Sequence, residues 1–190
     1  MAKAPLRRGF VKEANSWAAD LRREMKVALD APLCPRKLSE HLHVSVLSLS
    51  NLPACQERDL LLARRKGTHF SAAVCYVGLK AFILLNDSGG RKRQASDLAH
   101  ELAHIILRHK AENPFQDGGI RDFSENDEQE AEMLGPILLV SEAAALRAYR
   151  LISSNQHTLD SLSDEWGISK QVILLRINKV GAKNRVGLVA

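Results

Sequence analysis

The spacing of apolar residues predicts a chain of helices around a few short strands. Trp17, Leu21 and Met25 recur every four residues, which is typical of an amphipathic helix over residues 11–29. Two apolar runs rich in β-formers, at 70–77 and 81–86, are separated by the length of a hairpin loop. A further strand is expected near 44–49, and further helices are expected at 35–42, at 56–65, at 94–109, from 126 onward with an interruption at Gly135-Pro136, at 141–151, at 159–166 and at 169–177.

The order of these elements favours an α+β fold, in which a small mixed or antiparallel sheet packs on helices. Residues 1–151 are expected to form the main domain, and residues 152–190 a C-terminal helical segment packed on it. In that segment Gly167 ends one short helix and Ser169 begins the next, a pattern similar to a helix-turn-helix. Packing on the core is favoured over DNA contact because the second helix offers few groups to a DNA groove, namely Lys170, Gln171, Arg176 and Lys179.

The composition is that of an ordinary soluble domain. Of 190 residues, 45% are apolar and 26% are charged, which is enough for one hydrophobic core. The net charge of +5 is only mildly basic, and 5% aromatic residues disfavour a surface that stacks on bases. Three cysteines, at 34, 55 and 75, fit neither a disulfide framework nor a thiolate zinc site. The chain shows no signal-peptide core and no apolar run long enough to span a membrane, so a cytoplasmic protein is expected.

One motif carries chemistry: His100-Glu101-Leu102-Ala103-His104, an HExxH sequence inside the predicted helix at 94–109. Residues four apart lie one above the other on a helix, so both imidazoles can reach one metal ion. Glu101 then lies beside the open position of the metal, where it can take a proton from a water molecule. Zinc suits such a site because it is redox-inert and accepts nitrogen and oxygen ligands. Histidines at this spacing also arise by chance on surface helices, but the apolar neighbours of the motif favour a rigid metal site.

A metal site of this kind needs a third ligand from the protein. His109 follows the second histidine by five residues, about 140° further round the helix, so it is expected at the helix C-terminus and not on the metal. Six of the eleven residues at 122–132 are acidic and none is basic, and Glu128 and Glu132 share one helical face. One of these two carboxylates is expected to complete the metal site while the other orients a histidine. Glu130 points off that face and is the weaker candidate.

The motif and its surroundings resemble the ImmA/IrrE family of metallopeptidases. The similarity includes the strand ending at Asn86, the motif helix with its apolar neighbours, and the acidic helix that follows. In the family that helix has the form E-x-E-A-N-x-F-A-x-x-L-L-M-P, and this chain retains Glu128, Glu130, Ala131, Leu138 and Leu139. It departs from the family at Glu132 for Asn, Leu134 for Phe, Gly135 for Ala, and Val140-Ser141 for Met-Pro.

The resemblance implies an endopeptidase that depends on Zn²⁺, with Mn²⁺ as the alternative metal. It implies that His100, His104 and Glu128 hold the metal, that Glu101 is the catalytic base, and that Glu132 lies beside one of the histidines. The implied substrate is a protein, a helix-turn-helix transcriptional repressor whose cleavage derepresses genes, as in stress responses. The alternative is a non-catalytic regulatory module whose zinc site is structural or vestigial and which binds a protein partner or DNA. The oligomeric state stays open.

Three details of the site also stay open at this point. Metallopeptidases of this architecture hold an extended peptide along an edge strand, and either 81–86 or its hairpin partner is expected to supply that edge. The basic residues 91–93 before the motif helix are expected to form a solvated loop. No single side chain stands out as the stabiliser of a developing oxyanion, for which the candidates are Tyr76, His69, Arg121 and Tyr149.

Overall fold

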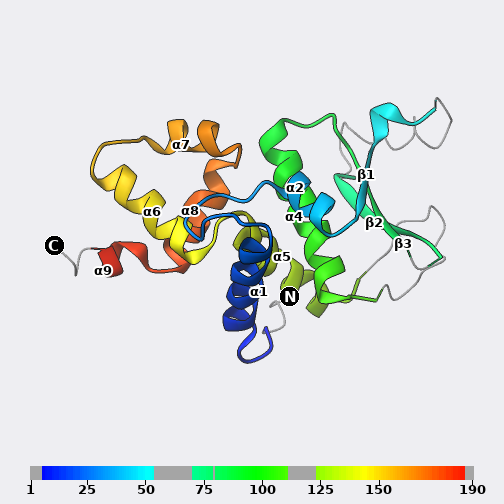
Figure 1. Cartoon of the computed structure of the whole chain (residues 1–190), viewed down its shortest axis with the longest axis horizontal. Helices are drawn as coiled ribbons and strands as arrows, with labels where there is room; N and C mark the ends of the chain where they lie inside the picture. The colour runs from blue at the N-terminus through cyan, green and yellow to red at the C-terminus, as the bar shows by residue number, and fades with distance from the viewer. Residues whose placement is uncertain (1–5, 54–69, 79, 111–122, 187–190) are drawn as a thin grey trace.

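The computed structural model describes residues 6–53, 70–78, 80–110 and 123–186 (Figure 1). The helices are α1 (Phe10–Glu24), α2 (Pro35–His41), the 3₁₀ turn η1 (Leu49–Asn51), α4 (Arg91–Leu107), α5 (Glu125–Leu139), α6 (Glu142–Ser153), α7 (Leu159–Trp166), α8 (Lys170–Lys179) and α9 (Ala182–Val186). The strands are β1 (Ser45–Ser48), β2 (Ala72–Val77) and β3 (Lys80–Leu85). The helix expected at 56–65 and two oxyanion candidates, His69 and Arg121, lie outside the described residues.

The three strands form one mixed sheet with the order β1-β3-β2. β1 runs parallel to β3, while β2 and β3 form the expected antiparallel hairpin, with Val74 opposite Ile83. The α+β class is therefore confirmed. β3 lies in the centre, which leaves its hairpin partner β2 on the outside of the sheet. α4 packs on β2 and β3 from one side, and α5 packs against α4 (Figure 1).

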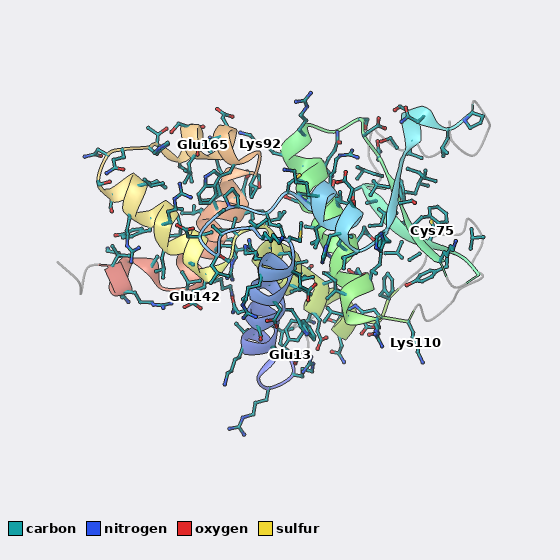
Figure 2. All side chains as sticks on the ribbon, in the orientation of Figure 1. Glu13, Cys75, Lys92, Lys110, Glu142 and Glu165 are labelled. Carbon is teal, nitrogen blue, oxygen red and sulfur yellow. The ribbon has the colours of Figure 1, made fainter. Side chains whose placement is uncertain are left out.

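The motif helix begins earlier than predicted. α4 starts at Arg91, so the basic residues at 91–93 form its first turn and the prediction of a loop there is wrong. The Nζ of Lys92 donates hydrogen bonds to the Oδ1 of Asp164 at 2.6 Å and to the Oγ of Ser163 at 2.8 Å. Figure 2 shows Lys92 reaching toward α7, which carries Glu165. The charged side chain of Lys92 thus joins the start of α4 to α7.

The helix after the motif is also longer than predicted. α5 continues through Gly135 and Pro136 to Leu139, so the expected interruption does not split it. The proline removes only one backbone hydrogen bond, and the close packing of α5 on α4 holds the remaining turns together. A Cβ added at Gly135 would lie 3.3 Å from the Cα and the N of His100. The glycine therefore allows α5 to approach the backbone of α4 at the first histidine of the motif.

Two hydrophobic clusters fill the interior. The first cluster joins α1, α2, the sheet and the facing sides of α4 and α5, with Leu38, Ile83, Leu102 and Leu134 fully buried. The second cluster joins α6, α7, α8 and α9 to the far sides of α4 and α5; its members include Ala99, Leu139, Ala145, Leu162 and Ile173. Both clusters share α4 and α5 as a common wall, so these two helices are packed on two sides. The predicted boundary between residues 151 and 152 remains a prediction.

The C-terminal helix pair has the expected form. Gly167 ends α7 in the left-handed conformation at φ 64°, and the side chain of Ser169 caps α8. Two of the groups considered for DNA contact are engaged inside the chain. Arg176 is buried and its Nε donates to the carbonyl of Val140 at 2.9 Å, and Lys170 forms an ion pair with Asp160 at 2.7 Å. None of the described helices combines the length and the apolar character needed to cross a bilayer.

Candidate metal centre

α4 and α5 bring the three sequence-predicted ligands together. His100 and His104 lie one turn apart on α4, with their Nε2 atoms 3.1 Å from each other. Glu128, from the first turn of α5, places one carboxylate oxygen 3.2 Å from the Nε2 of His100 and the other 3.6 Å from the Nε2 of His104. Among the described residues, this is the group of histidine, cysteine and acidic side chains whose donor atoms converge, all within 4.8 Å of one another.

The spacing of these atoms fits a tetrahedral metal ion. Ligand atoms at about 2.0–2.1 Å from a tetrahedral zinc lie roughly 3.3 Å from one another. The two histidine nitrogens, at 3.1 Å, and the Oε2 of Glu128, at 3.2 Å from the Nε2 of His100, lie close to that value, while the 3.6 Å to the Nε2 of His104 is from the other carboxylate oxygen, Oε1. Two imidazole nitrogens and one carboxylate are also a donor set found in catalytic zinc sites with an open fourth position. The residues present therefore fit the metal that the motif implies.

The two histidines lie in different electrostatic surroundings. Burial, and then the neighbouring rings of His100 and His109, lower the pKa of His104 to about 3. His104 is thus neutral at neutral pH, which is the form that binds a metal. Burial also lowers the pKa of His100, but the hydrogen bond with Glu128 and the nearby carboxylates outweigh it and raise the pKa overall.

The predicted base, Glu101, lies between the metal site and the sheet. Its side chain is nearly buried, at 8% exposure, and one carboxylate oxygen accepts a hydrogen bond from the backbone N–H of Val74 on β2 at 3.1 Å. Burial raises the pKa of Glu101 to about 7, although the neighbouring His100 acts in the opposite direction. A carboxyl group with a pKa near neutrality can both accept and return a proton, as general acid–base catalysis requires.

The other acidic residues of α5 have separate positions. Glu132 lies one turn after Glu128 and is exposed, and its charge contributes to the raised pKa of His100. This agrees with the expected side of the site, while its role in orienting a histidine stays a prediction. Glu130 points off the shared face as expected, and it accepts a hydrogen bond from the Nε of Arg7 at 2.8 Å.

Sequence reasoning missed the residues that contact His104 from behind. His109 does not join the metal ligands, as predicted, but its Nδ1 lies 2.9 Å from the Nδ1 of His104. Arg108 ends α4 in the left-handed conformation at φ 57°, which turns the chain so that His109 faces back toward the helix. The ring of Phe123 stacks on that of His104 at 3.8 Å. If α4 continued as a regular helix through residue 109, His109 and His104 would not be in contact. The contact depends on the turn at Arg108, which the sequence pattern did not predict.

Comparison with known families agrees with this geometry. Residues 55–178, more than half of the chain, match the family Peptidase_M78, described as the IrrE N-terminal-like domain. The chain belongs to this family. The matched range includes α4, α5 and all three candidate ligands, and the family supports a metallopeptidase-type function. No curated protein matches the chain.

Proposed function

We propose that this protein is a zinc-dependent endopeptidase in which His100, His104 and Glu128 hold the metal. The observation that carries the proposal is the position of Glu101, buried beside the histidines and fixed by the backbone of β2. A histidine pair with a carboxylate can bind a metal ion without catalysis. A buried carboxyl group with a pKa near 7 at the same place serves catalysis.

The chain's own groups supply the proton transfers of peptide hydrolysis. The metal, when bound, polarises the scissile carbonyl and makes water a stronger acid. Glu101 accepts the proton of the attacking water, holds it on its carboxylate, and gives it to the leaving amine nitrogen. The N–H of Val74 steers this carboxylate by occupying one of its oxygens. Of the described oxyanion candidates, Tyr76 lies on β2 two residues from Val74, and Tyr149 packs against the second cluster.

The substrate segment binds in an extended form beside β2. Among the described strands β3 is central, so of the two expected candidates only its hairpin partner β2 is an outer strand of the sheet. The N–H of Val74 points to Glu101 and not to β3, so the alternate residues Ala72 and Tyr76 also direct their backbone groups outward. A peptide added there as a further strand passes the carboxylate of Glu101. The chemistry of strand addition is the support for this part of the proposal.

The substrate is a helix-turn-helix transcriptional repressor, and its cleavage derepresses the genes that it controls. The support is the similarity to the ImmA/IrrE family at Glu128, Glu130 and Ala131, together with the family match. Mn²⁺ is the alternative metal, since it also accepts histidine and carboxylate ligands.

The test compares wild type, Glu101→Gln and the matched control Glu125→Gln. Glu125 lies exposed in the first turn of α5, so its substitution changes the same charge without touching Glu101. Each protein is loaded with zinc and incubated with a repressor encoded in the same genomic neighbourhood, and cleavage is followed by mass spectrometry. We expect Glu101→Gln to retain its zinc and to cleave about 10²–10⁴-fold more slowly, while Glu125→Gln behaves as wild type.

Equal cleavage by wild type and Glu101→Gln would contradict the role of Glu101. If neither protein cleaves any repressor or an unfolded casein, while both bind zinc in equal amounts, the non-catalytic regulatory module is correct. Cleavage of casein but of no repressor would support the peptidase activity and contradict the proposal that a repressor is the substrate.

A further inference from the structure

A third histidine contacts the candidate metal site, on the side of His104 opposite the ring nitrogen that faces His100 and Glu128. His109 follows the end of α4, and its side chain is only 5% exposed. One ring nitrogen, Nδ1, lies 2.9 Å from the Nδ1 of His104. The other, Nε2, is buried and faces the Oδ1 of Asp127 and the Oε2 of Glu130, each at 3.5 Å. His109 thus connects a candidate metal ligand with two carboxylates of α5.

The neighbours of each ring nitrogen indicate which nitrogen of His109 and of His104 carries a hydrogen. The Nε2 of His109 has no hydrogen-bond partner among the described residues, but it faces two carboxylate oxygens at 3.5 Å, which repel a ring lone pair, so the hydrogen is assigned to Nε2. In that tautomer the Nδ1 of His109 is an acceptor. Two ring nitrogens at 2.9 Å share one hydrogen, and with His109 in this tautomer the hydrogen belongs to the Nδ1 of His104. With Nδ1 protonated, the neutral ring of His104 keeps its lone pair on Nε2, the nitrogen that faces His100 and Glu128.

Other contacts fix the geometry in which this arrangement operates. Phe123 stacks on the ring of His104 with an angle of 18° between the planes, which limits rotation of that ring. Arg7 donates a hydrogen bond to Glu130, so this carboxylate is held in place on the far side of His109. The backbone N–H of His109 donates to the carbonyl of His104 at 3.0 Å, which fixes the distance between the two residues.

We propose that His109 is a positioning residue that holds His104 in the tautomer with Nδ1 protonated, so that Nε2 is ready to bind the metal. The inference rests on the metal site of the proposed function and adds a residue to it. A hydrogen-bond partner on one ring nitrogen of a histidine sets which nitrogen is protonated. It also sets the direction in which the other nitrogen points as a metal ligand. His109 contacts neither the metal position nor Glu101 and acts only through His104.

A matched set of substitutions separates this role from simple packing. In His109→Asn the amide oxygen takes the place of Nδ1 and still accepts from His104. In His109→Gln the amide is placed near Nε2, so that the acceptor at the position of Nδ1 is lost, and His109→Leu removes both. His157→Leu is the control, because His157 pairs with Glu165 in the C-terminal helices, far along the chain from the motif.

Two measurements follow each variant. The first is zinc affinity, by competition with a chromophoric chelator. We expect His109→Gln and His109→Leu to bind zinc about 10–100-fold more weakly, and His109→Asn and His157→Leu to stay close to wild type. The second is the tautomer of His104 in the metal-free protein, by long-range ¹H–¹⁵N NMR. We expect protonated Nδ1 in wild type and His109→Asn, and loss of that signature in His109→Gln and His109→Leu.

The outcomes distinguish this inference from the proposed function. Equal zinc affinity in all variants, or protonated Nε2 on His104 in wild type, overturns the role of His109 and leaves the peptidase intact. Failure of wild type to bind zinc overturns the metal site, whereas the NMR signature still decides whether His109 sets the tautomer. A loss of affinity in His109→Asn equal to that in His109→Leu assigns His109 to packing, and the inference is then wrong.

Discussion

The two hydrophobic clusters share α4 and α5, but they bury different kinds of polar groups. In the second cluster and at its border, the buried polar side chains bond to main-chain carbonyls: Ser163 donates to Ile168, and Arg176 donates to Val140. Beside the first cluster, Arg22 and Ser39 also bond to main-chain carbonyls, but Glu101 and His104 face other titratable side chains, and burial raises the pKa of Glu101 and lowers that of His104. The buried hydrogen bonds in and around the second cluster join helices of the fold, whereas Glu101 and His104 have pKa values suited to proton transfer and metal binding.

The helices of the two regions also differ in how they begin and in what they bury. α6, α7 and α8 begin at side-chain caps from Ser141, Thr158 and Ser169, and their buried residues are mainly apolar. α4 begins at Gly90 without a side-chain cap, and its buried face includes Glu101 and His104. We therefore expect the C-terminal helices to contribute mainly to stability and α4 to contribute mainly to the candidate metal site. Variants in the two regions are expected to separate stability from metal binding.

The largest loss of stability is expected from Leu162→Ala in the second cluster. Leu162 is fully buried, and its truncation leaves a cavity that costs about 2–5 kcal/mol in the free energy of unfolding. Zinc affinity of the folded protein should not change, because Leu162 lies on α7 in the second cluster, whereas the candidate ligands are carried by α4 and α5. Urea unfolding and chelator competition measure the two quantities.

Leu174→Ala on α8 is the control for that prediction. Leu174 is 47% exposed, so its truncation should change stability by less than about 0.5 kcal/mol. A loss of zinc affinity in Leu162→Ala at temperatures where the protein is folded would show that the two regions are one functional unit.

A buried arginine at the border of the two regions gives the next largest effect. Arg176→Met leaves the carbonyl of Val140 without its partner and removes the contact with Asn15, which we expect to cost about 1–3 kcal/mol. Arg185→Met, on an exposed arginine that pairs with Glu142, should cost less than about 1 kcal/mol. Thermal unfolding in the presence of zinc compares the two. Equal losses in both variants would assign the effect to charge and not to the buried hydrogen bonds.

Much of the candidate site was predictable because it is local in sequence. His100 and His104 face one way on any regular helix, and the acidic residues at 122–132 already indicated where a third ligand lies. The contact between His109 and His104 was not predictable, since it depends on the left-handed turn at Arg108. The edge strand was not predictable either, because strand order depends on pairing between distant segments.

The fold shows the same limit at Gly135-Pro136. Local rules predict that the helix is interrupted there, and they are wrong because α5 is held by its long contact with α4. The departure from the family at Gly135 now has a physical meaning. A side chain at this position would meet the backbone of His100. The glycine therefore sets how closely α5 approaches α4, and its backbone flexibility is not needed there.

Gly135→Ala is expected to affect both quantities, since it lies in the shared wall. Alanine favours the helix by about 1 kcal/mol, but its Cβ at 3.3 Å from the backbone of His100 costs about 1–3 kcal/mol in overpacking. We expect a small net loss of stability and a clearly weaker zinc affinity, because α5 carries Glu128 away from the histidines. Gly90→Ala is the control, as no atom lies within 4 Å of its added Cβ. Unchanged zinc affinity in Gly135→Ala would mean that the helix distance does not set the metal geometry.

The smallest effect is expected from Ser169→Ala, which removes the cap of α8. The hydroxyl of Ser169 accepts from the N–H of Val172 at 3.3 Å, and its loss should cost about 1 kcal/mol and lower the melting temperature by roughly 2–4 °C. Ser16→Ala, on the exposed face of α1, is the control and should leave the melting temperature unchanged. Zinc affinity should equal that of wild type, since α8 carries none of the three candidate ligands and packs on α5. If removing this one cap weakens zinc binding while stability barely changes, the C-terminal helices act on the metal site directly, and the division between a stabilising and a reactive region fails.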